Sequence, residues 1–502
     1  MTRLVQGLYT VALAGLALYA LHALVLIVVY LHARLGGRRS GKGEGGLGHG
    51  SSLWSGASDD RSLPCVTVQV PLRNEQHVAR RCLEAVAGLA WPRERLEIQV
   101  LDDSDDGTLA VVDGAVAELR EAGVRITVLR RPTPAGYKAG ALAAGLAVAQ
   151  GAYIAMFDAD FVPAPDFLRQ TLPHFLNDPA LGMVQARWGH LNAETSLMTR
   201  VQALVLDAHF TVEHVAREHA QWLTNFNGTA GVWRRAAIED AGGWQTDTLT
   251  EDLDLSYRAQ LRGWGVRYLP DVVVPAELPP LLSAFKAQQE RWATGAFQCL
   301  RKLAGPLLRS PHLTPVQKVM GLLHLSGYAN QPLLLLMILL TLPMVLTNPT
   351  FADFTLWLGA LAAVPSLLYV LGQVALYEDW LRRVWAYPVL VLMWMGMAWS
   401  LTLAACRGLL RWGGTFVRTP KYGLTAEDGD GWRGSTYRPR VRATWVGELS
   451  IGIYVCVAIW AAVRLAHGHL IPLALGYALG EVLVVVITAS ESLRHRSGAR
   501  TV

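Results

Sequence analysis

Pairs of aspartates occur at two places in the first third of the sequence, each directly after a short β-rich segment. Asp102 and Asp103 form the first pair, and Asp158 and Asp160, separated by one alanine, form the second. Carboxylate oxygens are hard ligands that suit Mg²⁺ or Mn²⁺, and an Asp-x-Asp pair can hold such an ion against phosphate groups. An isolated pair also fits a simple turn closed by an Asx hydrogen bond. Because the second pair follows a buried-looking strand, we expect it to bind a divalent metal ion.

A third acidic pair, Glu251 and Asp252, follows a Gly-Gly-Trp turn and begins a helical pattern. Carboxylates are common at a helix N-terminus simply because the free amides and the helix dipole favour negative charge there. A desolvated carboxylate can instead take the proton of a hydroxyl group during nucleophilic attack. Asp252 is our candidate for this general base, and Glu251 is an alternative that spacing does not separate from it.

Basic and aromatic side chains are placed where they could meet the same substrate. Lys138 follows a glycine-flanked turn and could contact a phosphate group, although its position also fits an exposed lysine. Gln288, Arg291 and Trp292 share one turn of a predicted helix, since positions three and four apart are neighbours. Trp offers a flat surface to a sugar and Arg can bind a diphosphate, but the same two side chains could anchor a helix at a membrane surface.

Three histidines, His209, His214 and His219, are spaced five residues apart in an amphipathic stretch. Clustered histidines can bind metal ions. Residues five and ten positions apart do not share one face of an α-helix, so we do not expect a histidine metal site here.

Strand-like and helical patterns alternate in the segment that carries these residues. Four β-rich segments separated by three helical ones predict a mostly parallel sheet covered by helices on both faces. Ligands bind such sheets at the carboxyl ends of the strands, where both aspartate pairs fall. The sequence therefore predicts an α/β domain over residues 64–306. The strands are expected at Val66–Val70, Glu97–Leu101, Arg125–Leu129 and Ala152–Phe157, and the helices at Gln76–Leu89, Thr108–Glu121 and Gly136–Ala149.

The overall composition indicates attachment to a membrane. Of the 502 residues, 52% are hydrophobic and 17% are charged, which is too apolar for an ordinary soluble protein of this length. The net charge of +5 is modest and the basic residues lie beside apolar segments, so we expect no nucleic-acid partner. Five dispersed cysteines predict neither a disulfide framework nor a zinc site.

Apolar segments long enough to cross a bilayer lie on both sides of the α/β domain. Residues 1–33 are expected to form an uncleaved N-terminal transmembrane helix, followed by a Gly/Ser-rich linker over residues 34–63. Residues 307–490 are expected to form a membrane domain of about four spans, followed by a cytosolic tail over residues 491–502. The four spans are expected at Gly321–Leu346, Phe354–Val374, Trp445–Val463 and Ile471–Val486.

One further apolar segment, at residues 385–406, has basic residues on both sides. If both flanks face the cytoplasm, as the positive-inside tendency favours, this segment cannot cross the membrane. We expect an interfacial or re-entrant helix, and the alternative is a sixth span that places the next basic loop outside. The same argument places the α/β domain in the cytoplasm, at a membrane that we expect to be of the bacterial inner or plasma type.

Four motifs follow one another along the chain: the acidic pair, the D-x-D, a T/S-E-D at Thr250–Asp252 and a Q-x-x-R-W at Gln288–Trp292. In this order, the motifs resemble those of the processive family 2 glycosyltransferases, which include cellulose, hyaluronan and mannan synthases. Residues 138–142, 157–161 and 225–234 are similar to cellulose-synthase-like glucomannan and xyloglucan-backbone synthases. A single motif of this kind is weak evidence, whereas the ordered set is specific.

The resemblance covers roughly residues 66–422 and implies a GT-A-like (Rossmann-like) cytosolic domain with defined roles for its side chains. Asp252 is then the catalytic base, and the activated hydroxyl attacks with inversion at the anomeric carbon. Asp158 and Asp160 hold the metal ion. The nucleotide sugar is expected at Glu75, Asp102, Asp103, Lys138 and Asp158, and the acceptor at Asn227, Gly228, Thr229, Glu251, Gln288, Arg291 and Trp292. A gating-like loop over residues 413–440 is expected to cover the donor pocket with Phe416, Thr419, Pro420 and Lys421.

The residues and the resemblance together predict a membrane-bound inverting β-glycosyltransferase that extends a polysaccharide of the β-glucan or β-mannan type. The expected donor is UDP-glucose or GDP-mannose, and the expected partners are a polysaccharide or glycan acceptor and membrane lipid. A non-processive transferase that acts on a lipid, similar to ceramide glucosyltransferases, is the alternative among enzymes. A non-catalytic membrane relative that kept the fold is the alternative outside them.

Overall fold

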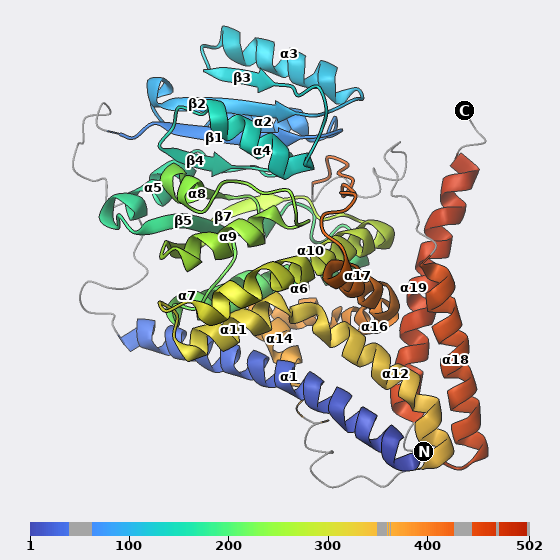
Figure 1. Cartoon of the computed structure of the whole chain (residues 1–502). Helices are drawn as coiled ribbons and strands as arrows, with labels where there is room; N and C mark the ends of the chain where they lie inside the picture. The colour runs from blue at the N-terminus through green and yellow to red at the C-terminus, as the bar shows by residue number, and fades with distance from the viewer. Residues whose placement is uncertain are drawn as a thin grey trace.

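The computed structural model describes residues 1–39, 63–348, 363–425, 444–467 and 471–498, together with residues 359 and 361. Within this part of the chain, an α/β domain lies above a group of long helices (Figure 1). The charged and functional motifs of the sequence are concentrated where these two parts meet.

The described part of the α/β domain is built on one seven-stranded sheet in the order β3-β2-β1-β4-β6-β5-β7. β1 pairs in parallel with β2 and β4, β2 with β3, and β5 with β7. β6 runs antiparallel to both of its neighbours, so the sheet is mixed. The strands are β1 Val66–Leu72, β2 Leu96–Asp102, β3 Ile126–Leu129, β4 Tyr153–Met156, β5 Leu181–His190, β6 Gly231–Arg234 and β7 Gly265–Ala276.

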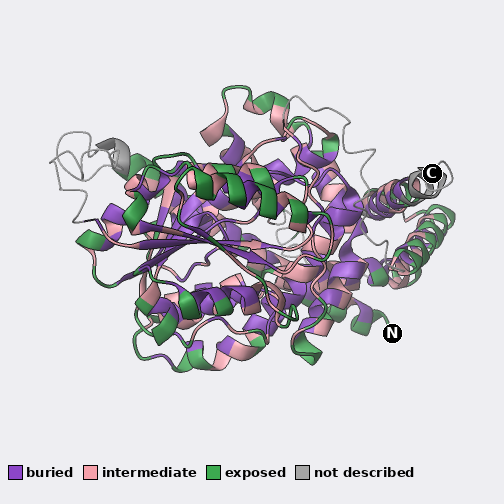
Figure 2. Ribbon diagram, turned by 90° about the horizontal axis from the view of Figure 1, so that it is seen from above, coloured by how far each residue is buried: buried purple, intermediate pink, exposed green. Residues whose placement is uncertain are grey.

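Helices cover both faces of this sheet and turn exposed surfaces to solvent, while the strands between them are buried (Figure 2). The predicted alternation of strands and helices over residues 66–149 matches the observed order of elements, and α3 spans the predicted residues. The helices are α2 Ala79–Ala87, η3 Arg93–Arg95, α3 Thr108–Glu121, α4 Tyr137–Val148, α5 Phe167–Asn177, α6 Leu197–Ala208, η4 His209–Glu213, α7 His214–His219, α8 Arg235–Asp240 and α9 Glu251–Leu261.

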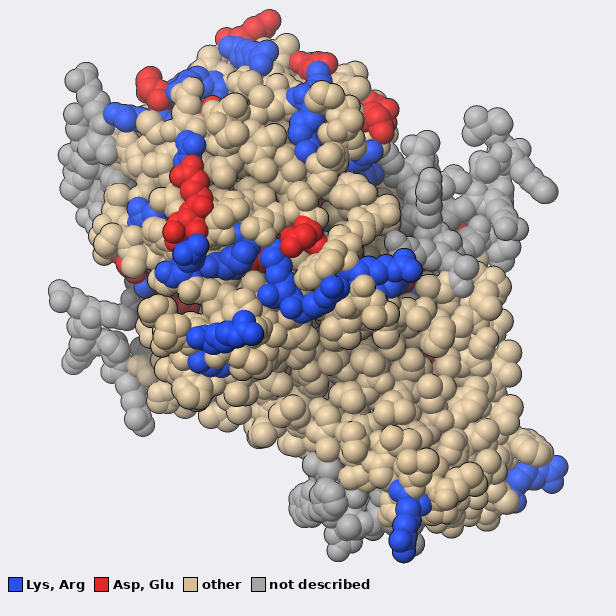
Figure 3. Space-filling view, in the orientation of Figure 1, with Lys and Arg blue, Asp and Glu red and all other residues tan. Residues whose placement is uncertain are grey.

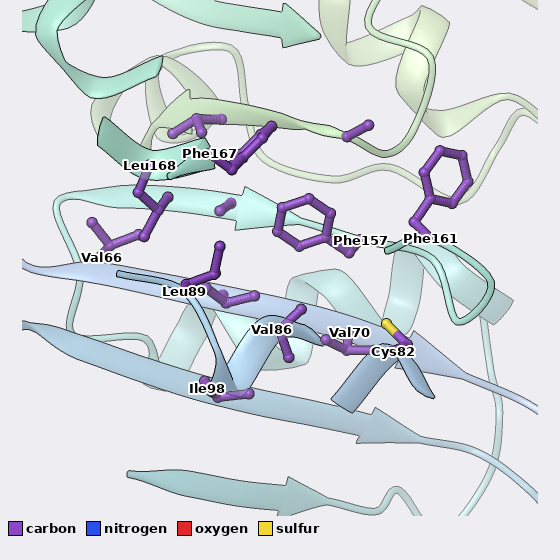
Figure 4. Close-up of a cluster of buried hydrophobic side chains, with 14 of the residues drawn as sticks. Val66, Val70, Cys82, Val86, Leu89, Ile98, Phe157, Phe161, Phe167 and Leu168 are labelled. Carbon is purple, nitrogen blue, oxygen red and sulfur yellow. The ribbon is translucent and has the colours of Figure 1, made fainter. Parts of the chain in front are cut away.

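Strand β4 shows how burial on both faces places the second aspartate pair. Ile154 and Met156 pack into the core on one face, whereas Ala155 and Phe157 pack into the core on the other. This alternation follows the two-residue period of a strand, and burial of both faces explains the continuous apolar run. Phe157 meets the ring of Phe167 edge to face at 5.0 Å between ring centroids (Figure 4). The strand therefore ends against a fixed core, and the following aspartates emerge from its carboxyl end.

The remaining helices form the lower part of the molecule (Figure 1). Four helices of the described residues are long and apolar enough to cross a membrane, namely Thr2–Gly36, Gly327–Thr347, Trp445–Arg464 and Ala474–Glu491. The elements are α1 Thr2–Arg39, α10 Leu282–Arg309, α11 Pro315–Leu325, η5 Gly327–Ala329, α12 Asn330–Thr347, α14 Val364–Leu376, α15 Trp380–Val384, α16 Tyr387–Gly396, α17 Ala398–Leu410, α18 Trp445–Arg464 and α19 Ile471–Gly498.

The ends of these long helices meet at a common level far from the sheet. Val5 of α1 packs with Met344 near the end of α12. Val345 packs with Ala461 near the end of α18, and Ile471 at the start of α19 joins the same cluster. The long helices therefore begin or end together at one side, as expected for segments that cross one layer.

The segment at residues 385–406 forms two helices instead of one. The pair Trp380–Gly396 and Ala398–Leu410 is bent by 55° at residue 397, which fits either a broken span or a re-entrant segment. The second arm packs closely on α10, where the hydroxyl of Thr294 donates to the carbonyl of Ala404 at 3.2 Å. Residues 354–358, 360 and 362 of the span predicted at Phe354–Val374 lie outside the described residues, and its second half belongs to α14.

Three predicted domain limits fall inside helices. α1 continues to Arg39, six residues into the predicted linker. α10 continues through Pro306 to Arg309, so the predicted limit at residue 306 lies within its last turn. α19 continues to Gly498, into the predicted tail. In each case the apolar sequence pattern ends before the helix ends. A helix limit placed from composition therefore comes too early. The rest of the linker and residues 426–440 of the gating-like loop lie outside the described residues.

Phe157→Ala should destabilise the α/β domain, because it opens a cavity beside a fully buried ring. The expected loss is about 3–5 kcal/mol, seen as a lower midpoint of thermal unfolding of the detergent-solubilised protein. Leu176→Ala on the exposed side of α5 is the matched control and should leave the midpoint nearly unchanged. Equal midpoints for both variants would contradict the packing described here.

Candidate active site

One cavity of about 780 Å³ joins the carboxyl ends of the strands to the long helices. Its walls include the acidic motifs of the α/β domain, six side chains of α10, and residues of α1, α12, α14 and α16. Charged side chains gather on the upper half of the molecule, over the α/β domain and its lower edge, while the lower half is mostly uncharged (Figure 3). The cavity therefore runs from a charged region towards an apolar one.

The first aspartate pair is held by two consecutive arginines that follow β3. Arg130 Nε donates to Asp102 Oδ2 at 3.0 Å, and Arg131 Nε donates to Asp103 Oδ1 at 3.0 Å. Asp102 also accepts the N–H of Ser104, is almost completely buried, and does not line the cavity. Asp103 does line it. The structure therefore leaves only the second member of the predicted pair in a position to contact a ligand.

Each aspartate of the D-x-D motif is paired with a lysine from a different element. Lys138, at the start of α4, places Nζ 2.6 Å from Asp158 Oδ1 and donates to the carbonyl of Gly228 at 2.9 Å. Lys421 places Nζ 2.6 Å from Asp160 Oδ2. Burial lowers the pKa of Lys138, but the neighbouring carboxylates outweigh it and the net pKa is raised, so this lysine stays charged. Both aspartates thus lie where the protein already supplies positive charge.

Asp158 and Asp160 fit a divalent metal only in combination with a ligand. In the described part of the chain, no group of three or more His, Cys, Asp or Glu side chains is arranged to hold a metal ion. Mg²⁺ and similar ions are commonly held by one or two carboxylates, several waters and substrate phosphates. Two aspartates with compensating ammonium groups match that pattern, with a diphosphate supplying the remaining oxygens.

Asp252 lies in the first turn of α9 and faces the cavity. Burial, followed by the negative charge of Glu251, raises the pKa of Asp252 to about 7, while Lys138 and Arg291 act in the opposite direction. A carboxyl group that is half ionised near neutral pH is well matched to the role of a general base. Glu251 also lines the cavity and lies 3.9 Å from Lys138 Nζ.

The segment at residues 227–229 supports the acidic groups more than it lines the cavity. Gly228 has a φ of +81°, and a Cβ at this position would lie 2.8 Å from Asp252 Oδ2, so only glycine fits. The hydroxyl of Thr229 is buried and accepts the backbone N–H of Asp158 at 2.8 Å. Asn227 alone reaches the cavity. Gly228 and Thr229 therefore support the acidic groups from behind the cavity wall, and their contact with an acceptor stays a prediction.

Gln288, Arg291 and Trp292 all line the cavity from α10. The guanidinium of Arg291 lies 4.6 Å from the ring centroid of Phe416, a residue of the gating-like loop. Phe416 also stacks on Tyr137 with 5.8 Å between ring centroids. The loop therefore contacts both α10 and the start of α4, and it closes one side of the cavity.

Other loop residues contact the first strand and the D-x-D motif. Arg418 lies 3.0 Å from the carboxylate of Glu75, a cavity residue whose pKa burial raises to about 8. Thr419 and Lys421 line the cavity, whereas Pro420 is buried beside it without lining it. The described part of the loop, residues 413–425, is thus docked on the α/β domain.

The histidines are arranged differently from the α-helical expectation. Residues His209–Glu213 form a turn of π-helix, which holds more residues per turn than an α-helix. The two Nε2 atoms of His209 and His214 consequently lie 3.1 Å apart, closer than the spacing of an α-helix indicates. His219 instead lies beside the ring of His32, at 5.6 Å between ring centroids. His209 lines the cavity, and its Nε2 accepts an N–H of the side-chain amide of Asn227 at 3.0 Å.

Charged residues of this site that the sequence analysis did not name include Arg130, Arg131 and Glu277, and Arg418 lies in the predicted gating-like loop without an assigned role. A pair of adjacent arginines directly after a strand edge was a usable signal, because parallel strand ends meet. A second usable signal was Glu277, a single acidic residue directly after the apolar segment of β7. Neither pattern states which carboxylate or loop the side chain will meet, since that depends on tertiary contacts.

Comparisons with known proteins agree with this geometry. Residues 64–295 match the family model described as glycosyltransferase like family 2. The chain is 44% identical over 262 residues to glucomannan 4-beta-mannosyltransferase 1 of Oryza sativa subsp. japonica, covering 51% of this chain and 50% of that protein. It is 44% identical over 262 residues to glucomannan 4-beta-mannosyltransferase 2 of Arabidopsis thaliana, covering 51% and 49%. The chain thus matches about half the length of these curated relatives.

A solved structure shares the fold. A mannosyltransferase from Pyrobaculum calidifontis, solved in complex with GDP-Man and Mn²⁺, matches with a TM-score of 0.51 and 24% sequence identity. The match covers 80% of this chain and 99% of that protein. At this identity the likeness concerns the fold, and it confirms the expected GT-A-like sheet architecture.

The titration of Asp252 can be measured directly. The infrared signal of the Asp252 carboxyl group is the one that Asp252→Asn removes. We expect this signal to titrate near pH 7, because burial and the charge of Glu251 disfavour ionisation of Asp252. In Glu251→Gln the midpoint should fall, since the repelling negative charge is gone. Glu239→Gln, which removes an exposed carboxyl group, is the matched control and should leave the titration midpoint of Asp252 unchanged. A midpoint unchanged in Glu251→Gln would contradict the coupling.

Proposed function

Residues 64–295 form a glycosyltransferase domain of the family 2 type, and from this premise we propose that the chain transfers a hexose from a nucleotide diphosphate sugar to a growing β-linked polysaccharide. One observation carries the proposal: a single cavity connects the D-x-D motif, Asp252 and the α10 side chains to the membrane-type helices. Residues that could bind a donor, a candidate base and a path for an acceptor therefore share one cavity.

The donor pocket has the groups that a nucleotide diphosphate requires. Asp103 and Glu75 lie at the strand ends where the nucleoside would bind, as in other α/β sheets. Lys138 and Arg291 present positive charge to the cavity and can neutralise the diphosphate as it leaves. Asp158 and Asp160 would hold Mg²⁺ or Mn²⁺, which when bound clamps the diphosphate oxygens and offsets their charge.

Asp252 performs the proton transfer. Its ionised carboxylate accepts the proton of the acceptor hydroxyl while that oxygen forms a bond to the anomeric carbon. The bond from this carbon to the diphosphate oxygen breaks, and the nucleoside diphosphate leaves from the opposite side, which inverts the configuration. Gly228 leaves room for the carboxylate, and the Lys138 ammonium stabilises its charged form.

The acceptor is assigned from the other end of the cavity. Trp292, Tyr369 and Trp394 offer flat faces on which sugars can stack, and Asn330 and Gln331 offer amides for hydroxyl groups. This lining favours a glycan chain. Because the relatives are named as mannosyltransferases, GDP-mannose is the donor that we would test first, followed by UDP-glucose.

A lipid acceptor is the second candidate, and a specific observation favours it. Leu16 and Leu26 of α1, with Leu334 and Leu368, line the same cavity at its membrane end. Apolar walls of this kind suit an acyl or isoprenoid chain whose polar head faces Asp252. The product analysis described below separates the two acceptors.

The long apolar helices support a position in a membrane, with the α/β domain on the cytoplasmic side. This orientation follows from the basic residues beside the apolar segments, since the positive-inside tendency places them in the cytoplasm. The type of membrane, which the sequence predicts to be a bacterial inner or plasma membrane, stays a prediction.

Radiolabel transfer by the detergent-purified protein tests the proposal. GDP-mannose and UDP-glucose are supplied separately with Mn²⁺ or Mg²⁺, and products are divided into high-molecular-weight and lipid-extractable fractions. We expect metal-dependent polymer that Asp252→Asn reduces by about 10³-fold or more, as loss of a catalytic base implies. Label only in the lipid fraction would establish the second candidate. Full activity of Asp252→Asn would contradict the assigned base.

The pH dependence of the rate follows from the same carboxyl group. Asp252 must be ionised to act. We therefore expect kcat/KM to rise with pH, with the midpoint of the rise near pH 7. One pH unit below the midpoint, about a tenth of the maximal rate should remain. A rate that falls as the pH rises through this range would contradict the role of Asp252 as a base.

A further inference from the structure

Glu277 directly follows β7, and its carboxylate contacts the backbone of the gating-like loop. Oε1 accepts the N–H of Tyr422 at 2.7 Å, and Oε2 accepts the N–H groups of Gly423 and Leu424 at 2.9 and 3.0 Å. The side chain of Glu277 is completely buried. Hydrogen bonds from amides to a carboxylate are stronger than those between neutral groups. These three contacts therefore fix the loop at the end of β7.

Lys421 immediately precedes this contact and is held between two acceptors. Its Nζ lies 2.6 Å from Asp160 Oδ2 and donates to the carbonyl oxygen of Glu277 at 2.7 Å. The backbone N–H of Glu277 donates to the same oxygen of Asp160 at 3.2 Å. An ammonium group thus lies against one of the two carboxylate oxygens through which Asp160 could bind a metal ion.

The surrounding contacts leave this arrangement little freedom. Gly423 has a φ of +79°, and a Cβ there would lie 2.9 Å from the carbonyl oxygen of His77. Arg81 approaches Glu277 Oε2 at 3.8 Å, and Arg418 contacts Glu75 three residues before Lys421. The loop is therefore anchored to the α/β domain on both sides of Lys421.

We propose that Glu277 is a positioning residue that docks residues 422–424 and thereby places the Lys421 ammonium on Asp160 as an internal cation, which a divalent metal ion must displace. The proposal rests on the proposed function, because that function requires a metal at Asp158 and Asp160. Loop docking and metal binding then compete for one carboxylate. Arrival of a metal–nucleotide pair releases Lys421, which becomes free to move towards the diphosphate.

Mn²⁺ binding without any nucleotide tests this competition. The purified full-length protein is titrated with Mn²⁺ alone, and free Mn²⁺ is measured by electron paramagnetic resonance. Lys421→Gln should raise the Mn²⁺ affinity by about threefold or more. When a site is blocked most of the time, its apparent affinity is the intrinsic affinity multiplied by the fraction of molecules in which the site is open. Lys421→Arg restores a cation and should return the affinity to the wild-type value. Lys318→Gln is the matched control for loss of a lysine charge and should have no effect.

The role of Glu277 requires a second readout. In Glu277→Gln, hydrogen exchange of a peptide covering residues 421–425 should become faster, and the Mn²⁺ affinity should rise in parallel. Faster exchange with unchanged Mn²⁺ affinity would overturn the proposal, because Glu277 would then anchor the loop without placing the cation. Unchanged affinity in Lys421→Gln, or equal affinities for Lys421→Gln and Lys421→Arg, would also overturn it.

These outcomes are separate from the success of the transferase assay. Metal titration and hydrogen exchange use no sugar donor, so the competition can be present in a protein that transfers nothing from the donors tested. Polymer formation with no change of Mn²⁺ affinity in any variant would leave the proposed function standing and overturn this inference. If Glu277→Gln fails to fold, Lys421→Gln keeps every carboxylate and still tests the competition.

Discussion

Compensation of buried negative charge is the constraint on which the site depends. The cavity collects Glu75, Asp103, Asp158, Asp160 and Asp252 in a space from which water is partly excluded, and such groups are costly without positive partners. The positive partners are Arg131, Lys138, Arg418 and Lys421, each within ion-pair distance of at least one carboxylate. Asp252 is the exception, because its pKa is raised to about 7 and, in the part of the chain that the structure describes, it forms no ion pair.

This charge balance explains why elements far apart in sequence must meet. The cations come from the segment after β3, from the start of α4 and from the loop that follows α17, whereas the carboxylates follow β1, β2 and β4. Helix α10 adds Arg291 and connects the α/β domain to the long helices. A substrate with two phosphates and a metal ion can replace these internal pairs without leaving a charge uncompensated. The pocket is therefore prepared for a ligand of mixed charge.

The sequence predicted strands β1 to β4 because local patterns determine them, whereas β5, β6 and β7 were not predicted. The alternating strands and helices over residues 66–149 follow from periodicity, and the D-x-D motif was placed correctly at a strand end. The hydrogen bond from the N–H of Asp158 to the hydroxyl of Thr229 was not predicted, because a motif gives proximity but not the direction of a side chain. The π-helical turn at His209 was missed because helical spacing assumes 3.6 residues per turn. Glu277 was missed because its partners are backbone amides of a distant loop.

An anomalous-scattering map of crystals grown with Mn²⁺ and a nucleotide sugar tests the central claim most directly. The account predicts a Mn²⁺ peak beside Asp158 and Asp160, with Lys421 displaced from Asp160 and the Asp252 carboxylate on the side of the anomeric carbon opposite the diphosphate. A peak elsewhere in the cavity, or Asp252 on the same side as the leaving diphosphate, would contradict it.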